Sequence, residues 1–223
     1  MSAPSPHAYP MHLRLAGKPV LVAGAGRVAT RKIERLVESG AQVEVVAPVA
    51  SGIVTRLAQQ GAVTLHLRPV APADVRGKFL VLAATNDNQE NARLAQTARE
   101  RGVLVSRVDA PGDSDFTVPA LARAPHVEAT ISTSGAAPSA SRRLGKELAL
   151  WLSQGPDRFV AEIAAVRQSL RGHPEATERL RCLSEGELFE ACARGDEARI
   201  QACREQALAG LEARPERDRE AAP

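Results

Sequence analysis

A short glycine-rich segment has the spacing that binds the phosphates of a dinucleotide. Gly24, Gly26 and Ala29 follow the pattern Gly-x-Gly-x-x-Gly/Ala, directly after the apolar run 19–23. Glycines in this pattern let the backbone turn tightly and approach a pyrophosphate, and the next helix presents its first amide groups to that ligand. We therefore expect Gly24 and Gly26 to bind a dinucleotide. The alternative is a tight turn without a ligand.

The segment expected to hold the ribose is unusual. The second strand of a NAD domain commonly ends in an acidic residue that binds the ribose hydroxyls. Here residues 46–49 read Val-Ala-Pro-Val, with neither an acid nor an arginine for a 2′-phosphate. We expect backbone groups around Pro48 and Val49 to hold the ribose, and Arg27 to lie near the phosphates.

A single aspartate, Asp109, follows the apolar run 103–108. Ligands of open α/β sheets bind at the carboxyl ends of the strands, so a carboxylate there is placed to act as a general base or to bind a metal. A loop aspartate that caps the turn before Pro111 is the alternative. The neighbouring Asp113 and Asp115 are expected to be solvated loop residues.

A hydroxyl-rich turn is the second candidate for ligand binding. Ser132, Thr133 and Ser134 precede an expected helix that carries Arg142. Hydroxyls, amides and a nearby cation suit an anionic group of a substrate. Capping of the helix beside a solvated basic turn is the alternative.

Composition excludes several classes of function. The cysteines (Cys182, Cys192 and Cys203) and five histidines lack the spacing of a zinc site, so we expect no resident metal and free thiols in a reducing cytoplasm. A net charge of +3 and 3% aromatic residues do not indicate nucleic-acid binding. No apolar run approaches the roughly 20 residues of a membrane span, and the N-terminus lacks the layout of a secretory signal. We expect a cytoplasmic protein.

The elements that position these residues alternate along the chain. Apolar runs predict strands at 19–23, 42–46, 63–67, 79–84 and 103–108, most of them separated by segments of helical periodicity. This alternation is typical of a Rossmann-like, doubly wound parallel sheet covered by helices on both faces.

Beyond residue 112 the pattern changes. Runs at 116–119 and 127–132 predict two strands without a helix between them, and the rest of the chain is helical. We expect a small α+β region followed by a helical C-terminal region. The expected divisions are a loose N-terminus 1–10, a NAD-binding domain 11–112, a dimerisation and substrate region 113–150, a helical region 151–213 and a frayed tail 214–223.

Together, these segments resemble the precorrin-2 dehydrogenase family, which includes the N-terminal module of siroheme synthase and the sirohydrochlorin ferrochelatases. Similarity runs from about residue 9 to 171, through the segments 12–18, 24–32, 82–87, 108–111 and 131–135. The Arg-Lys pair that ends segment 24–32 and the Val-Asp-Ala-Pro segment are more specific than the glycine pattern. Ser106 departs from the family, whose members often have asparagine there.

The resemblance implies NAD-dependent oxidation of precorrin-2 to sirohydrochlorin, in sirohaem biosynthesis, with insertion of ferrous iron by several members. Asp109 would serve in both reactions. Family members form homodimers through the second domain, with the active site near the subunit boundary. The nucleotide contacts expected from the matching segments are Arg27, Val28, Pro48, Val49, Thr85 and Asn86.

The substrate carries many carboxylates, which we expect Arg107, Arg142 and Arg143 to attract. Since the chain ends at Pro223 without a methyltransferase module, a stand-alone enzyme is expected. Two alternatives stay open. One is a dinucleotide-binding regulatory module that does not catalyse, and the other is a chelatase without dehydrogenase activity.

Overall fold

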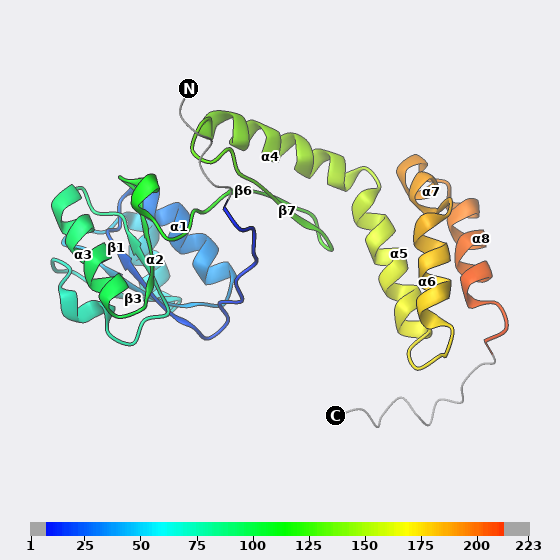
Figure 1. Cartoon of the computed structure of the whole chain (residues 1–223), viewed down its shortest axis with the longest axis horizontal. Helices are drawn as coiled ribbons and strands as arrows, with labels where there is room; N and C mark the ends of the chain where they lie inside the picture. The colour runs from blue at the N-terminus through cyan, green and yellow to red at the C-terminus, as the bar shows by residue number, and fades with distance from the viewer. Residues whose placement is uncertain (1–7, 212–223) are drawn as a thin grey trace. The chain divides into compact units, whose positions relative to one another are not determined.

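The computed structural model describes residues 8–211 and divides the chain into two compact units, Met1–Val118 and Pro119–Pro223. The expectations for residues 1–7 and for the tail 214–223 lie outside the described residues. Figure 1 shows the helices and strands of both units.

The first unit is built on a five-stranded parallel sheet in the order β3-β2-β1-β4-β5, which confirms the predicted α/β fold class. Each strand lies within a predicted run. Apolar runs of this length form strands that are buried on both faces of a sheet. The strands are β1 Pro19–Ala23, β2 Gln42–Val46, β3 Val63–His66, β4 Leu80–Ala83 and β5 Leu104–Arg107. The helices are α1 Arg27–Glu38, α2 Gly52–Gln59 and α3 Asn88–Glu100, with 3-10 turns η1 Pro72–Val75 and η2 Pro111–Asp113.

Alternate residues of the strands enter two separate cores. Val20 and Val22 of β1 pack with Ile33 of α1 and Val54 of α2 on one face. Leu21 of β1 belongs to the core of the opposite face, which is covered by α3 and η1. The sheet is therefore wound on both sides, and its loops carry the candidate site residues.

The first unit continues past residue 112, where the sequence placed the end of the nucleotide-binding domain. The backbone amide of Asp115 donates to the carbonyl of Val105 at 2.8 Å, and its carboxylate accepts from the amide of Val105 at 2.9 Å. Phe116 packs against the first core. Residues 113–118 are thus held against β5.

The second unit begins with an antiparallel ribbon of β6 Ala120–Arg123 and β7 Glu128–Ile131, followed by α4 Pro138–Ser153. The predicted strand at 116–119 is wrong. The register of the hairpin begins with the pair Ala120 and Ile131, and residues 116–119 are not part of either strand. Gly145 of α4 faces the ribbon, and a Cβ there would lie at an ordinary contact distance of 3.5 Å from the Cβ of Ala120.

Four helices complete the second unit: α5 Pro156–Ser169, α6 Ala176–Glu185, α7 Leu188–Arg194 and α8 Glu197–Leu208. They share a core that includes Val166, Leu170 and Leu188, as the helical spacing of apolar residues in α5 predicts. Between residues 8 and 211, no helix has both the length and the apolar character that a membrane crossing needs.

Candidate functional site

The glycine-rich loop, the loop after β2 and the loop after β4 meet at the carboxyl edge of the sheet. Ala23, at the end of β1, pairs with Val46 on one side and Ala83 on the other. The amide of Gly24 donates to the carbonyl of Val46 at 2.9 Å, and the amide of Ser51 donates to the carbonyl of Ala25 at 3.2 Å. Because the loops are bonded to one another, they form one surface at this edge.

Gly24 and Gly26 have different roles in this surface. Gly24 has φ +103°, and a Cβ there would lie 2.3 Å from the carbonyl oxygen of Ala84. Only glycine allows the two loops to approach this closely. Gly26 is the N-cap of α1, and a Cβ on it would meet no atom within 4 Å. The space next to the start of α1 is therefore open.

The start of α1 fits a dinucleotide phosphate. Its N-cap is a glycine without a side chain, so the first amide groups of the helix are left for a ligand. Arg27 and Val28 are exposed beside them, and so are Pro48 and Val49 after β2. All four residues lie at the carboxyl edge of the sheet.

Asp109 is an ion-paired carboxylate at the end of β5. Its Oδ2 accepts from Arg107 Nη2 at 2.7 Å, and its Oδ1 accepts from Asn91 Nδ2 at 3.1 Å. The side chains of Asp109 and Arg107 are 15% and 11% exposed. The hydrogen bond from Arg107 holds the pKa of Asp109 below its ordinary value of 3.8. Asp109 is therefore ionised at neutral pH.

Arg107 pairs with two acids at once. Its Nη1 donates to Asp113 Oδ2 at 2.6 Å, and Asp113 also pairs with Arg99. Arg99 in turn donates to Asp115. Asp113 and Asp115 are exposed, as predicted, and arginines of β5 and α3 also pair with them.

Thr85 belongs to the same network, whereas Asn86 is exposed beside it. The Thr85 hydroxyl lies 2.8 Å from the Oδ1 of Asn91. Asn91 was not among the sequence-based candidates. It lies three residues before Leu94 and four before Ala95, on the buried face of α3. A polar residue on an apolar helix face is the sequence signal that could have identified it.

The hydroxyl-rich turn belongs to the second unit, whereas Asp109 belongs to the first. Ser134 has φ +51°, and its amide donates to the Ser132 hydroxyl at 3.2 Å. The Thr133 hydroxyl accepts from the amide of Ala137 at 3.2 Å and supports the start of α4. Arg142 is exposed on that helix. The N-cap of α4 is Ala137, without a side-chain cap, so the hydroxyls stabilise the turn itself rather than cap the helix.

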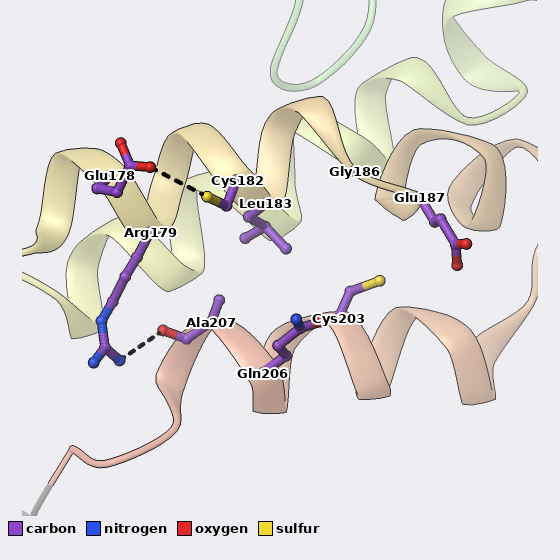
Figure 2. A pocket seen from close by; sticks show the side chains of 9 residues that line it. All are labelled: Glu178, Arg179, Cys182, Leu183, Gly186, Glu187, Cys203, Gln206 and Ala207. Carbon is purple, nitrogen blue, oxygen red and sulfur yellow. Dashed lines mark hydrogen bonds between the residues drawn. The ribbon is translucent and has the colours of Figure 1, made fainter.

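Two of the three cysteines line a pocket within the C-terminal helices. Cys182 of α6 and Cys203 of α8 face a cavity of about 360 Å³, and Arg179 donates to the carbonyl of Ala207 at one end (Figure 2). Cys182, Cys192 and Cys203 are free thiols. Among residues 8–211, no group of three or more His, Cys, Asp or Glu side chains is placed to hold a metal ion.

Known proteins match both the sequence and the fold. Residues 11–120 match the family described as putative NAD(P)-binding. Siroheme synthase 1 of Aeromonas salmonicida is 35% identical over 198 residues, which are 85% of this chain and 42% of that protein. The siroheme synthase of Methylococcus capsulatus is 36% identical over 165 residues, 73% of this chain and 34% of that protein.

A solved structure has the same fold as this chain. The structure titled SirC, precorrin-2 dehydrogenase, superimposes with a TM-score of 0.75 at 24% identity and covers 90% of this chain and 98% of that one. This chain spans less than half the length of the two curated relatives described above.

Proposed function

Because the chain belongs to the family that includes the N-terminal module of siroheme synthase, we propose that it is an NAD-dependent precorrin-2 dehydrogenase of sirohaem biosynthesis. It would oxidise precorrin-2 to sirohydrochlorin. The observation that carries the proposal is the ionised Asp109, held by Arg107 and Asn91 at the sheet edge that also carries the glycine-rich loop.

The residues of the first unit fit NAD. Gly24 and Gly26 leave space for the pyrophosphate, the start of α1 supplies its amides, and the exposed Pro48 and Val49 lie where the ribose is expected. Thr85 and Asn86 border the same edge on the β4 side. Bound NAD supplies the hydride acceptor.

Asp109 acts as a fixed negative charge rather than as a strong base. Loss of a hydride leaves positive charge on the tetrapyrrole, and a carboxylate that is ionised before the reaction stabilises this charge without reorganising. A carboxyl whose pKa is lowered by Arg107 is a weak proton acceptor. We therefore propose that Asp109 polarises the pyrrole nitrogens, and that the proton lost together with the hydride passes to solvent.

The carboxylates of the substrate need cations that are not already paired. Arg107 is bonded to Asp109 and Asp113, so it does not serve this purpose as the sequence suggested. Arg143 pairs with Glu147 on α4. The exposed Arg142, with the hydroxyls at residues 132–134, is the remaining candidate of the second unit for binding a substrate carboxylate.

Ferrous iron would be a second substrate. Its insertion into sirohydrochlorin requires weak binding and release, and Asp109 is the acid that would act in it. Turnover of sirohydrochlorin with ferrous iron, in the absence of NAD, measures this activity separately. We also propose a cytoplasmic location, where the three cysteines would stay reduced.

A homodimer through α4 is supported by apolar side chains on its exposed face. Leu144, Leu150 and Trp151 are 51%, 57% and 51% exposed, whereas Ser141 and Gly145 face the ribbon. Large exposed apolar side chains gathered on one helix are typical of an interface. This interface would bring the substrate turns of two subunits together.

The dimer predicts a clear effect of Leu144→Arg. Because Leu144 is exposed, the introduced charge is expected to leave the melting temperature of the single subunit nearly unchanged. In sedimentation equilibrium, the variant should be a monomer. The emission of Trp151, the one tryptophan of the chain, should move to longer wavelength at the same time. Lys146→Glu, an exposed change on the same helix, is the control. A monomeric wild-type protein would contradict the dimer.

The proposed activity is tested by incubating the purified protein with NAD and precorrin-2. NADH absorbance and the sirohydrochlorin spectrum are expected to appear together and in equal amounts. NAD binding without turnover would favour the regulatory alternative. Iron insertion without NAD reduction would favour the chelatase alternative.

A further inference from the structure

A buried asparagine connects the cofactor loop with the candidate catalytic aspartate. Asn91 lies in the first turns of α3 with 0% of its surface exposed. Its nearest neighbours on the inner face of the helix are the apolar Leu94 and Ala95. Burying an amide among apolar side chains is unfavourable unless each of its polar atoms is hydrogen-bonded.

Both ends of the Asn91 amide are fully used. Its Nδ2 donates to the carbonyl of Thr85 at 3.2 Å and to Asp109 Oδ1 at 3.1 Å. Its Oδ1 accepts from the amide of Thr85 at 3.1 Å and from the Thr85 hydroxyl at 2.8 Å, a shorter contact than that of the hydroxyl with the carbonyl of Asp87 at 3.1 Å. This matches the two donors and the two acceptor lone pairs of an asparagine side chain.

The bonding pattern allows only one orientation of the amide. Rotating it by half a turn would place its NH₂ group against the amide of Thr85, and its oxygen against the Asp109 carboxylate. Both arrangements are repulsive. A leucine of similar size would fill the space but would bond to neither partner.

We propose that Asn91 is a positioning residue that holds the Asp109 carboxylate in register with the dinucleotide-binding loop at Thr85. The inference rests on the proposed function, because it assigns the purpose of the network to hydride transfer. The carboxylate would be fixed on one side by Asn91 of α3 and on the other by Arg107 of β5. If the loop that holds the nicotinamide moves, the carboxylate would move with it, so its distance from the reacting carbon would stay constant.

The charges around Asp109 allow a direct test. The charged groups of this network are Arg107 on β5, Asp113 on η2, Arg99 on α3 and Asp115, and Asp113 reaches Asp109 only through Arg107. Asn91→Asp has nearly the same shape as the wild type and replaces the donor to Asp109 with a second carboxylate. Two carboxylates at this separation share a proton, so the pKa of the pair rises.

We expect kcat of Asn91→Asp with precorrin-2 to fall about tenfold or more, and the acid limb of its pH profile to move to higher pH. The sign follows from the requirement for an ionised Asp109: a raised pKa means that activity is lost at a higher pH. Gln89→Glu is the matched control, since it adds the same charge on an exposed side chain of the same helical turn. Its profile should match that of the wild type.

A second measurement does not depend on activity. Carboxyl ¹³C NMR of the protein without NAD or substrate should show Asp109 titrating below 3.8 in the wild type and at higher pH in Asn91→Asp. Asn91→Leu, which lacks every hydrogen bond of the amide, should lose turnover without this large rise in the pKa of Asp109. It provides the test if Asn91→Asp does not fold.

The outcomes separate the two proposals. A folded Asn91→Asp protein whose Asp109 titration and acid limb equal those of Gln89→Glu would overturn the positioning role. Wild-type protein that binds NAD but does not oxidise precorrin-2 would contradict the proposed function instead, and the NMR titration would then decide alone whether Asn91 holds Asp109.

Discussion

Replacing Asp109 with alanine is expected to lower the turnover of precorrin-2 by about a hundredfold to a thousandfold, while NAD still binds. The loss is the typical effect of removing a preorganised charge that stabilises the transition state. NAD binding should persist because Asp109 makes no hydrogen bond to the glycine-rich loop or to α1 among those of residues 8–211. Stopped-flow NADH absorbance measures the rate, and calorimetric titration measures the NAD affinity.

The pH dependence of the wild type should have a flat neutral region. The pKa of Asp109 is lowered, first by the hydrogen bond from Arg107, so its charge is present at and above 3.8 and is lost only as the pH falls through the lowered value. The part of the turnover rate that depends on this charge should likewise be lost only as the pH falls through the lowered pKa. An acid limb near neutral pH would show that another group controls the rate.

Asp74→Asn is the matched control for Asp109. Asp74 accepts two hydrogen bonds from Arg68, and these lower its pKa in the same way. It lies in η1, which is separate in sequence from the glycine-rich loop and from the loop after β4. Among residues 8–211, Asp74 makes no hydrogen bond to either loop. Its replacement removes an equivalent ion pair and should leave turnover unchanged. If Asp109→Ala keeps full turnover, the role assigned to Asp109 is wrong.

The sheet could be predicted because its strands are short and buried on both faces. β1 and β4 are continuous apolar runs, and the spacing of the glycines directly after β1 is enough to indicate the nucleotide-binding edge. The error at 116–119 has a different cause. The run is apolar enough for a strand, but the hairpin register begins at Ala120 and Phe116 is used in the core of the first unit.

The partners of Asp109 could not be read from local patterns. Asn91 is 18 residues from Asp109, and the contact depends on the pairing of β4 with β5, where Ala83 lies opposite Arg107. The sequence predicts that Arg107 attracts the substrate, because it does not show which of three nearby aspartates Arg107 contacts. The ion pairs with Asp109 and Asp113 use its guanidinium, and this changes Asp109 from a candidate base into a fixed anion.

Gly26→Asp is expected to weaken NAD binding about a thousandfold without loss of stability. A Cβ on Gly26 meets no atom within 4 Å, and aspartate is a favoured N-cap that accepts hydrogen bonds from the first amides of the helix. These are the amides assigned to the pyrophosphate. A carboxylate about 4 Å from a phosphate charge costs about 4 kcal/mol at an effective dielectric constant of 20, close to a thousandfold in affinity.

Gly24→Ala, unlike Gly26→Asp, should lower the stability of the protein. Its φ of +103° and the 2.3 Å approach to the carbonyl oxygen of Ala84 should lower the free energy of unfolding by about 1–3 kcal/mol or more. Gly61→Ala, with φ +72° and open space, isolates the backbone strain from the clash. Urea unfolding and NAD titration of the three variants separate fold from binding. A Gly26→Asp protein that is stable and binds NAD with wild-type affinity would place the cofactor away from this helix, because an N-cap carboxylate and a pyrophosphate cannot use the same amides.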